Sequence, residues 1–307
     1  MMIVVPVIGF ITGTILGSLV KALADRSLSN RSFWGRSYCP HCKKLLKWYD
    51  LLPIISYLIL GGKCRYCGDM IGMDYLLVEV VIGILIGFLF WQSSQNFSAI
   101  GGPASGWQFS IFLLDLIFKT FFITILAVLF LTDLKKMFIP DRIVLPAIVI
   151  SIIFIIFITV IKVIFLYSSL NQTQIGQLLL PPHSDYFQRH ALISAEPFIG
   201  SIISAILIAG FFMILIIVTS GKGMGGGDVK LGAFIGLGLS SPNSFVALML
   251  AFLTGALISL ILIIFGKKHF GQHIAFGPFL VLGALVTLFF GNQILDWYLH
   301  LSLSLNP

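Results

Sequence analysis

The stretch that decides the fold is Phe121–Pro140, which reads FFITILAVLFLTDLKKMFIP. Residues 121–132 carry no charge, and the span from residue 111 to 132 is long enough to cross the hydrocarbon core of a bilayer. Asp133 follows directly, ahead of a short basic turn. An ionisable acid at the edge of a bilayer is costly to hold, so Asp133 is a candidate functional residue.

The rest of the chain has the same apolar character. Its 307 residues are 58% hydrophobic and 10% charged, with a mean hydropathy of +1.04, which excludes an ordinary soluble domain. Further membrane-spanning stretches are predicted at 2–20, 75–92, 143–167, 198–219 and 274–295. The span 231–266 is too long for one helix and breaks at Ser240–Ser244, so it predicts two helices. We therefore expect an all-α polytopic membrane protein with about eight transmembrane helices.

The basic residues predict the topology. Nine of the 19 Lys and Arg residues lie between residues 21 and 74, and most of the others lie on every second loop after it. The positive-inside rule then places the loop 21–74 and Asp133 at the cytoplasmic face and both termini outside. The net charge of +7 reflects this topology, so no nucleic-acid partner is expected. The segment 168–197 is predicted to be an irregular outer loop.

The first apolar run has no basic residues ahead of it and no small-residue cleavage site after it. We therefore interpret residues 1–20 as a retained helix and not as a signal peptide. Gly9, Gly13 and Gly17 recur every four residues, a spacing that favours close packing of membrane helices.

A second acid, Asp228, follows the run Gly225-Gly226-Gly227. Two carboxylates that share a water can hydrolyse a peptide, because repulsion keeps one protonated and the other ionised. The glycines are expected to let the backbone approach a substrate and to start the helix in an unusual conformation. Pro140 is expected to end any continuous helix near Asp133. Alternatively, both acids are helix-end charges paired with neighbouring lysines.

All four cysteines lie in the loop 21–74, as Cys39-Pro-His-Cys42 and Cys64-Arg-Tyr-Cys67. Two such pairs can close a tetrahedral zinc site. A reducing cytoplasm argues against structural disulfides. A redox-active pair of the thioredoxin type is the alternative, but that fold needs a βαβ framework for which this loop has no room. The prediction is a structural zinc ion held by all four thiolates.

Taken together, these features resemble the type IV prepilin peptidases, which combine leader peptidase and N-methyltransferase activities in pilus assembly and type II secretion. Three motifs carry the resemblance in the same order: the cysteine loop from Ser37 to Cys67, Asp133 with Ile139-Pro140-Asp141, and the GxGD motif that ends in Asp228. The resemblance implies an enzyme of the bacterial inner membrane that acts on prepilins or pseudopilins. In it, Asp133 and Asp228 form the catalytic dyad that removes a short basic leader.

The resemblance also implies methyl transfer from S-adenosylmethionine to the new N-terminus, with Glu79 matching a family glutamate tied to the methylase region. The chain departs from the family pattern mainly in that region. The run Met73–Glu79 reads MDYLLVE where the family usually has Arg-Tyr-Pro-Leu-Val-Glu, and Lys21 or a neighbour replaces an asparagine expected after Gly17-Ser18. The variable residue of GxGD is glycine, where a larger residue is frequent.

Two other functions are compatible with intramembrane acids. A GxGD protease of the presenilin and signal-peptide-peptidase kind would cut within a membrane helix, but the cysteine loop counts against it. An ion-coupled transporter would use the acids as proton relays and should show an inverted repeat, which the sequence does not display. The expected organisation is a first helix (1–20), a cysteine-containing cytoplasmic loop (21–74) and a membrane peptidase core (75–307).

Overall fold

The computed structural model describes residues 4–29, 31–33, 35–99, 106–221, 224–265 and 275–304. This described part is almost entirely helical, and its β-structure consists of two isolated bridges. The elements are α1 (Val4–Leu28), η1 (Trp48–Leu51), α2 (Ile55–Ile59), α3 (Met73–Ala99), α4 (Gly106–Lys136), α5 (Asp141–Asn171), α6 (Gln174–Leu178), α7 (Tyr186–Val218), α8 (Gly226–Leu239), α9 (Asn243–Ile264) and α10 (Gly277–Ser304).

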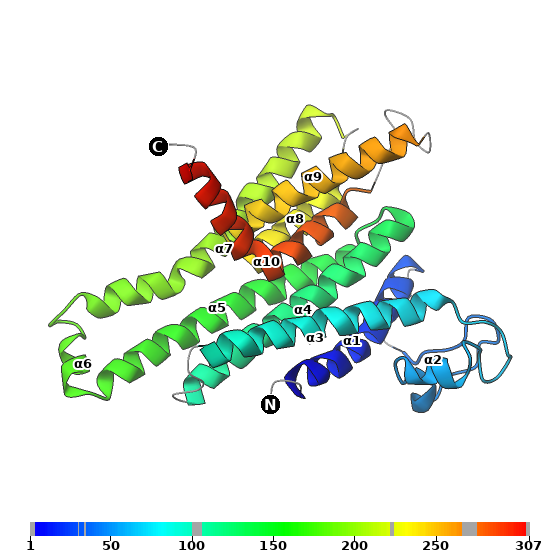
Figure 1. Ribbon diagram of the computed structural model, residues 1–307, viewed down its shortest axis with the longest axis horizontal. Coiled ribbons are helices and arrows are strands. Elements are labelled where there is room, and N and C mark those ends of the chain that lie inside the picture. The colour runs from blue at the N-terminus through cyan, green and yellow to red at the C-terminus, as the bar shows by residue number, and fades with distance from the viewer. Residues whose placement is uncertain are drawn as a thin grey trace. The chain divides into compact units, whose positions relative to one another are not determined.

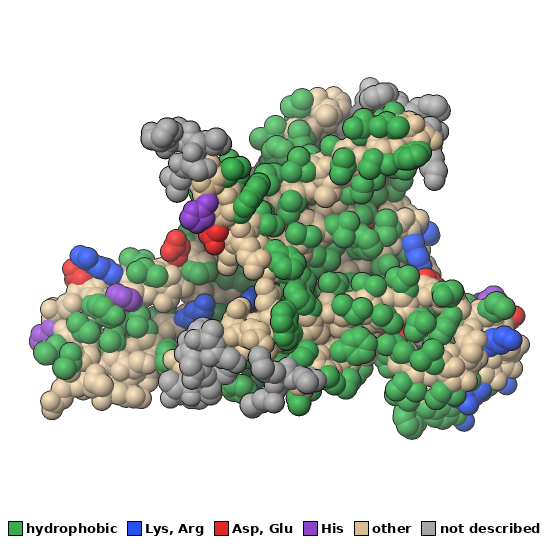
Figure 2. All heavy atoms as spheres, in the orientation of Figure 1, with side chains coloured by type: hydrophobic (Ala, Val, Ile, Leu, Met, Phe, Trp, Pro, Cys, Tyr) green, Lys and Arg blue, Asp and Glu red, His purple; other side chains and the backbone are tan. Residues whose placement is uncertain are grey.

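Within the described residues, seven helices are long and apolar enough to cross a membrane: α1, α3, α4, α5, α7, α9 and α10. The 14-residue α8 is the eighth apolar helix. It ends before Ser240 and α9 begins at Asn243, which confirms the predicted break. Hydrophobic side chains cover much of the helical surface in Figure 2, as expected where helices face lipid. The predicted polytopic all-α class is confirmed.

The chain divides into two compact units, and the first comprises residues 1–104 and 119–140. Here α1 and α3 pack side by side (Figure 1). A Cβ atom added at Gly9, Gly13 or Gly17 would lie 2.7 to 2.8 Å from an atom of α3. The predicted glycine packing is therefore confirmed. The helix that was expected to end near residue 20 continues to Leu28.

The second unit comprises residues 105–118 and 141–307, and α8 contacts α5, α7, α9 and α10 within it. Close packing of α8 on α7 depends on Gly236, where an added Cβ would lie 2.6 Å from the backbone of Ala205.

One prediction is wrong in this unit. The segment 168–197 is mostly helical, because α5 continues to Asn171, α6 follows, and α7 begins at Tyr186 (Figure 1). Hydropathy marks where a helix leaves the apolar layer, but it does not mark where backbone hydrogen bonding stops.

Candidate active site and metal centre

Asp133 lies in the last turn of α4, where its side chain is buried beside Thr132. The helix ends at Lys136, and the N–H of Met137 donates to the Asp133 carbonyl at 2.8 Å. Met137 has a left-handed backbone (φ 49°), which turns the chain out of the helix. The chain thus leaves the helix three residues before Pro140, which is buried and immediately precedes α5.

Asp228 lies in the first turn of α8 and is half-buried. The N-terminal end of a helix carries a partial positive charge, so Asp228 lies at the positive end of the α8 dipole. The preceding Gly225 has φ −90° and ψ 151°, an extended conformation that any residue adopts. The expectation of an unusual helix start is therefore wrong.

The glycines before Asp228 differ in their surroundings from the packing glycines of α1. A Cβ atom built at Gly225 or Gly226 would meet no atom of the described residues within 4 Å, and Gly227 is half-buried. There is therefore open space beside the backbone of two of the glycines that precede Asp228. Lys230, in the next turn, forms an ion pair with Asp141 at 2.5 Å and joins the start of α8 to the start of α5.

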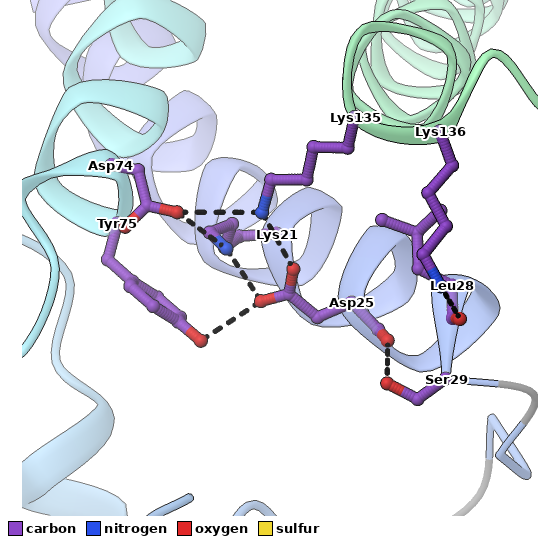
Figure 3. Close-up of polar contacts among 8 residues, drawn as sticks. All are labelled: Lys21, Asp25, Leu28, Ser29, Asp74, Tyr75, Lys135 and Lys136. Atoms are coloured by element: carbon purple, nitrogen blue, oxygen red, sulfur yellow. Dashed lines mark hydrogen bonds and ion pairs between the residues drawn. The ribbon is translucent and has the colours of Figure 1, made fainter.

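A network of charged residues joins the ends of α1, α3 and α4 (Figure 3). Lys21 of α1 is buried, and its Nζ lies 2.6 Å from Asp25 and 2.9 Å from Asp74. Lys135 of α4 lies 3.2 and 3.6 Å from the same two carboxylates. The Tyr75 hydroxyl donates to Asp25 at 2.9 Å, and its ring lies 4.1 Å from the Lys21 Nζ. The helical turn that carries Asp133 is thereby bound to α1 and α3.

The structure brings together two places where the sequence departs from the family pattern. Lys21 stands where an asparagine is expected nearby, and Asp74 lies in the altered run before Glu79. These two residues form a direct ion pair. A basic residue of α1 is therefore balanced by an acidic residue of α3.

The four cysteines form one cluster, in which their sulfur atoms all lie within 4.8 Å of one another. The two cysteine pairs lie in backbone turns of the same kind, one beginning at Cys39 and the other at Cys64. The N–H of Cys39 donates to the backbone carbonyl of Lys44 at 3.0 Å, and the N–H of Cys64 donates to the backbone carbonyl of Asp69 at 2.8 Å. Each turn is closed by one of the two β-bridges, Tyr38 with Leu45 and Lys63 with Met70. The residue after each second cysteine is left-handed: Lys43 (φ 61°) and Gly68 (φ 74°).

This donor set fits a zinc ion. Backbone N–H groups of Tyr66 and Cys67 lower the pKa of the Cys64 thiol to about 7, against the opposing effect of burial. The N–H of Asp69 favours the Cys67 thiolate, but burial and the neighbouring sulfurs raise the pKa of Cys67 to about 12. Without a cation, the neighbouring sulfurs thus oppose deprotonation of all four thiols. A zinc ion would supply the positive charge that stabilises four thiolate ligands. All four cysteines are free thiols.

Glu79 is buried in α3 and reaches into the loop. Its Oε2 accepts the N–H of Ile54 at 2.7 Å, and the Ser18 hydroxyl also bonds to its carboxylate. An added Cβ at Gly17 would lie 2.7 Å from the Glu79 Cα, so glycine allows this close approach. Glu79 therefore joins α1, α3 and the cysteine loop, a structural contact that its position in the sequence did not reveal.

Sequence reasoning also missed a polar contact within the loop. Asp50 accepts from Arg65 at 2.7 Å, from the Tyr66 hydroxyl at 3.2 Å and from the N–H of Lys47 at 3.2 Å. Burial acts against its ionisation, but these donors together lower the pKa of Asp50. The contact fastens η1 to the second cysteine turn. No sequence pattern marks it, because Asp50 and Arg65 lie 15 residues apart.

Comparisons with known proteins agree with these features. A family model described as "Bacterial Peptidase A24 N-terminal domain" matches residues 11–93, and one described as "Type IV leader peptidase family" matches residues 120–260. The chain is 29% identical to a prepilin leader peptidase/N-methyltransferase of Bacillus subtilis (strain 168), covering 96% of this chain and 98% of the relative. A protein of the same description from Legionella pneumophila is 27% identical, covering 87% and 76%. No solved structure matches the chain.

Proposed function

Because the chain belongs to the type IV leader peptidase family, we propose that it removes the leader peptide of prepilin-like proteins and methylates the new N-terminus. The observation that carries this proposal is the ordered match to two family models. The first covers the cysteine loop and Glu79, and the second covers Asp133 and Asp228. One chain therefore matches both family models, which supports a proposal of two activities.

Asp133 and Asp228 act as a pair in the proposed peptidase. One ionised carboxylate takes a proton from water as the water oxygen attacks the scissile carbonyl, and the protonated partner donates to that carbonyl. The pair shares its protons, so neither acid has a separate assignment. Support comes from the burial of Asp133 and from the open space beside Gly225 and Gly226.

The proposed cofactors are a zinc ion and S-adenosylmethionine. Cys39, Cys42, Cys64 and Cys67 hold the zinc, which stabilises the two turns of the loop. S-adenosylmethionine supplies the methyl group, and Glu79 belongs to the methylase region. The proposed location is the bacterial inner membrane, with the cysteine loop and the aspartate pair at the cytoplasmic face and both termini outside, as the distribution of basic residues indicates.

The test is co-expression with a prepilin, followed by mass spectrometry of the product. Asp133→Asn and Asp228→Asn should each abolish leader cleavage while the protein remains inserted in the membrane, because an amide neither activates water nor shares a proton. Normal processing by either variant would refute the aspartate pair. Cleavage within the hydrophobic helix of the pilin, rather than at its leader, would instead indicate an intramembrane protease.

A further inference from the structure

The short helix α2 has its apolar face on the outside. Ile55, Leu58 and Ile59 follow the spacing of one helical face, and each is between 55% and 74% exposed. Trp48, in the preceding η1, is 76% exposed. A loop surrounded by water would turn such side chains inward, because removing apolar surface from water is favourable. The outward face therefore indicates an apolar environment next to it.

The opposite side of α2 is fastened to the start of a membrane-spanning helix. The Tyr57 hydroxyl donates to the Ile71 carbonyl at 3.4 Å, just before α3. The N–H of Ile54 donates to Glu79 at 2.7 Å. Glu79 is six residues after Met73, the first residue of α3, which is about 9 Å along a helix axis at 1.5 Å per residue. The start of α2 therefore lies beside the first turns of α3, at the level where this helix enters the bilayer.

Basic side chains surround this apolar face in the sequence and on the surface. Exposed residues in the two cysteine turns and η1 include Lys43, Lys44, Lys47 and Lys63. Of the two acids in these segments, Asp50 is bound to Arg65, and Asp69 lies 3.7 Å from His41. Figure 2 shows hydrophobic side chains next to Lys and Arg on the part of the surface where Figure 1 places α2. Apolar residues flanked by lysines are typical of elements that lie in a membrane interface.

We propose that α2 and η1 form a membrane-docking surface for anionic phospholipid. The face of Ile55, Leu58 and Ile59, together with Trp48, inserts at the boundary between headgroups and acyl chains in the leaflet on the side of the loop. The surrounding lysines bind the lipid phosphates. Docking holds the cysteine cluster against the membrane surface beside α3. This inference is independent of the proposed peptidase activity.

The test uses Trp48 as a fluorescent reporter in the full chain. The other four tryptophans are replaced by phenylalanine, and the protein is reconstituted into phosphatidylcholine vesicles with or without phosphatidylglycerol. Some of the lipid carries bromine, which quenches tryptophan, either near the headgroup end or deep in the acyl chain. The expected result is strong quenching by the shallow bromine, weaker quenching by the deep bromine, and an increase in quenching with phosphatidylglycerol.

Variants distinguish docking from simple proximity to lipid. Replacing Ile55, Leu58 and Ile59 together by serine should remove the quenching, while zinc content reports that the loop remains folded. Leu45→Ser is the matched control, because it removes an exposed apolar side chain from the first cysteine turn and should leave quenching unchanged. Lys47→Gln should lower the docked-to-undocked ratio about fivefold, since each basic residue near an anionic surface contributes about 1 kcal/mol.

Three results would overturn the inference. Trp48 that is not quenched by either brominated lipid would show that the surface does not meet the bilayer. Equal loss of quenching in the serine triple variant and in Leu45→Ser would remove the assignment to α2. A change in Trp48 fluorescence that requires an added prepilin peptide and does not depend on the lipid would identify the face as a peptide-binding surface instead.

Discussion

Replacing Lys21 by methionine tests how strongly the charged network of Figure 3 binds the end of α4 to α1 and α3. Methionine preserves much of the length and the apolar stem of lysine but removes the ammonium group. Within this network, Asp74 would then retain Lys135, and Asp25 would retain Lys135 and the Tyr75 hydroxyl. Lys135→Met is the matched control, because Lys135 pairs with the same two carboxylates.

The expected magnitude depends on exposure. The Lys21 side chain is 3% exposed, whereas Asp25 and Asp74 are 32% and 50% exposed. Removing one partner of a fully buried pair costs about 3–5 kcal/mol, and an exposed pair contributes about 0–1 kcal/mol. With one buried member, Lys21→Met should lower the free energy of unfolding by about 2 kcal/mol, between these limits. Lys135 is 41% exposed, so Lys135→Met should cost about 0.5 kcal/mol.

The measurement is unfolding of the purified protein in mixed micelles by increasing SDS, followed by circular dichroism. The loss in Lys135→Met should shrink further in high salt, while the loss in Lys21→Met should change little, because buried charges are screened less. The double variant Lys21→Met/Asp74→Asn should recover part of the stability, because it removes one of the two carboxylates that Lys21 no longer neutralises. Equal losses in the two single variants would refute the reasoning, since burial would then have no effect on the strength of the pairs.

Three further predictions concern the loop and its anchor. Glu79→Gln should keep the acceptor for the Ile54 N–H but slow methylation of the processed N-terminus more than it slows cleavage. The difference between the two losses should exceed about tenfold in rate, or ~1.4 kcal/mol in the barrier. Equal losses of the two products on one mass-spectrometric time course would make Glu79 purely structural. Metal analysis should find about one zinc per chain, and less in Cys64→Ser, whereas unchanged zinc would exclude the four-thiolate site. The lowered pKa of Asp50 means that its contribution is complete above about pH 4 and is lost only as pH falls through the folded-state value. Loop resistance to proteolysis should therefore be weaker in Asp50→Asn at both pH 7 and pH 5, and a defect confined to one pH would contradict this.

Several features were predictable because they depend on short windows of sequence. Transfer of an apolar segment into a bilayer is favourable residue by residue, so hydropathy located the spanning helices and the break near Ser240. The spacing of Gly9, Gly13 and Gly17 predicted a close helix contact, which the structure places on α3. The two cysteine pairs predicted a cluster of four thiols, and the structure contains it.

Other features were not predictable, because they depend on segments that meet only after folding. Asp25 and Lys135 form an ion pair although they lie 110 residues apart in the sequence. Glu79 accepts a hydrogen bond from Ile54, which lies 25 residues away. The helical character of 168–197 was missed because hydropathy does not report backbone hydrogen bonds outside the apolar layer.

The outward apolar face of α2 is the clearest example of a feature that the sequence leaves open and the tertiary structure decides. The amino-acid sequence of Ile55–Ile59 is compatible with either a buried turn or an exposed helical face. Which face turns outward was decided by two bonds, from Ile54 to Glu79 and from Tyr57 to Ile71. The sequence by itself determined that the chain spans a membrane and holds four clustered thiols, because transfer energies and ligand spacing act locally. Tertiary structure alone decided which side chains meet, because a hydrogen bond or ion pair requires both partners within about 3 Å.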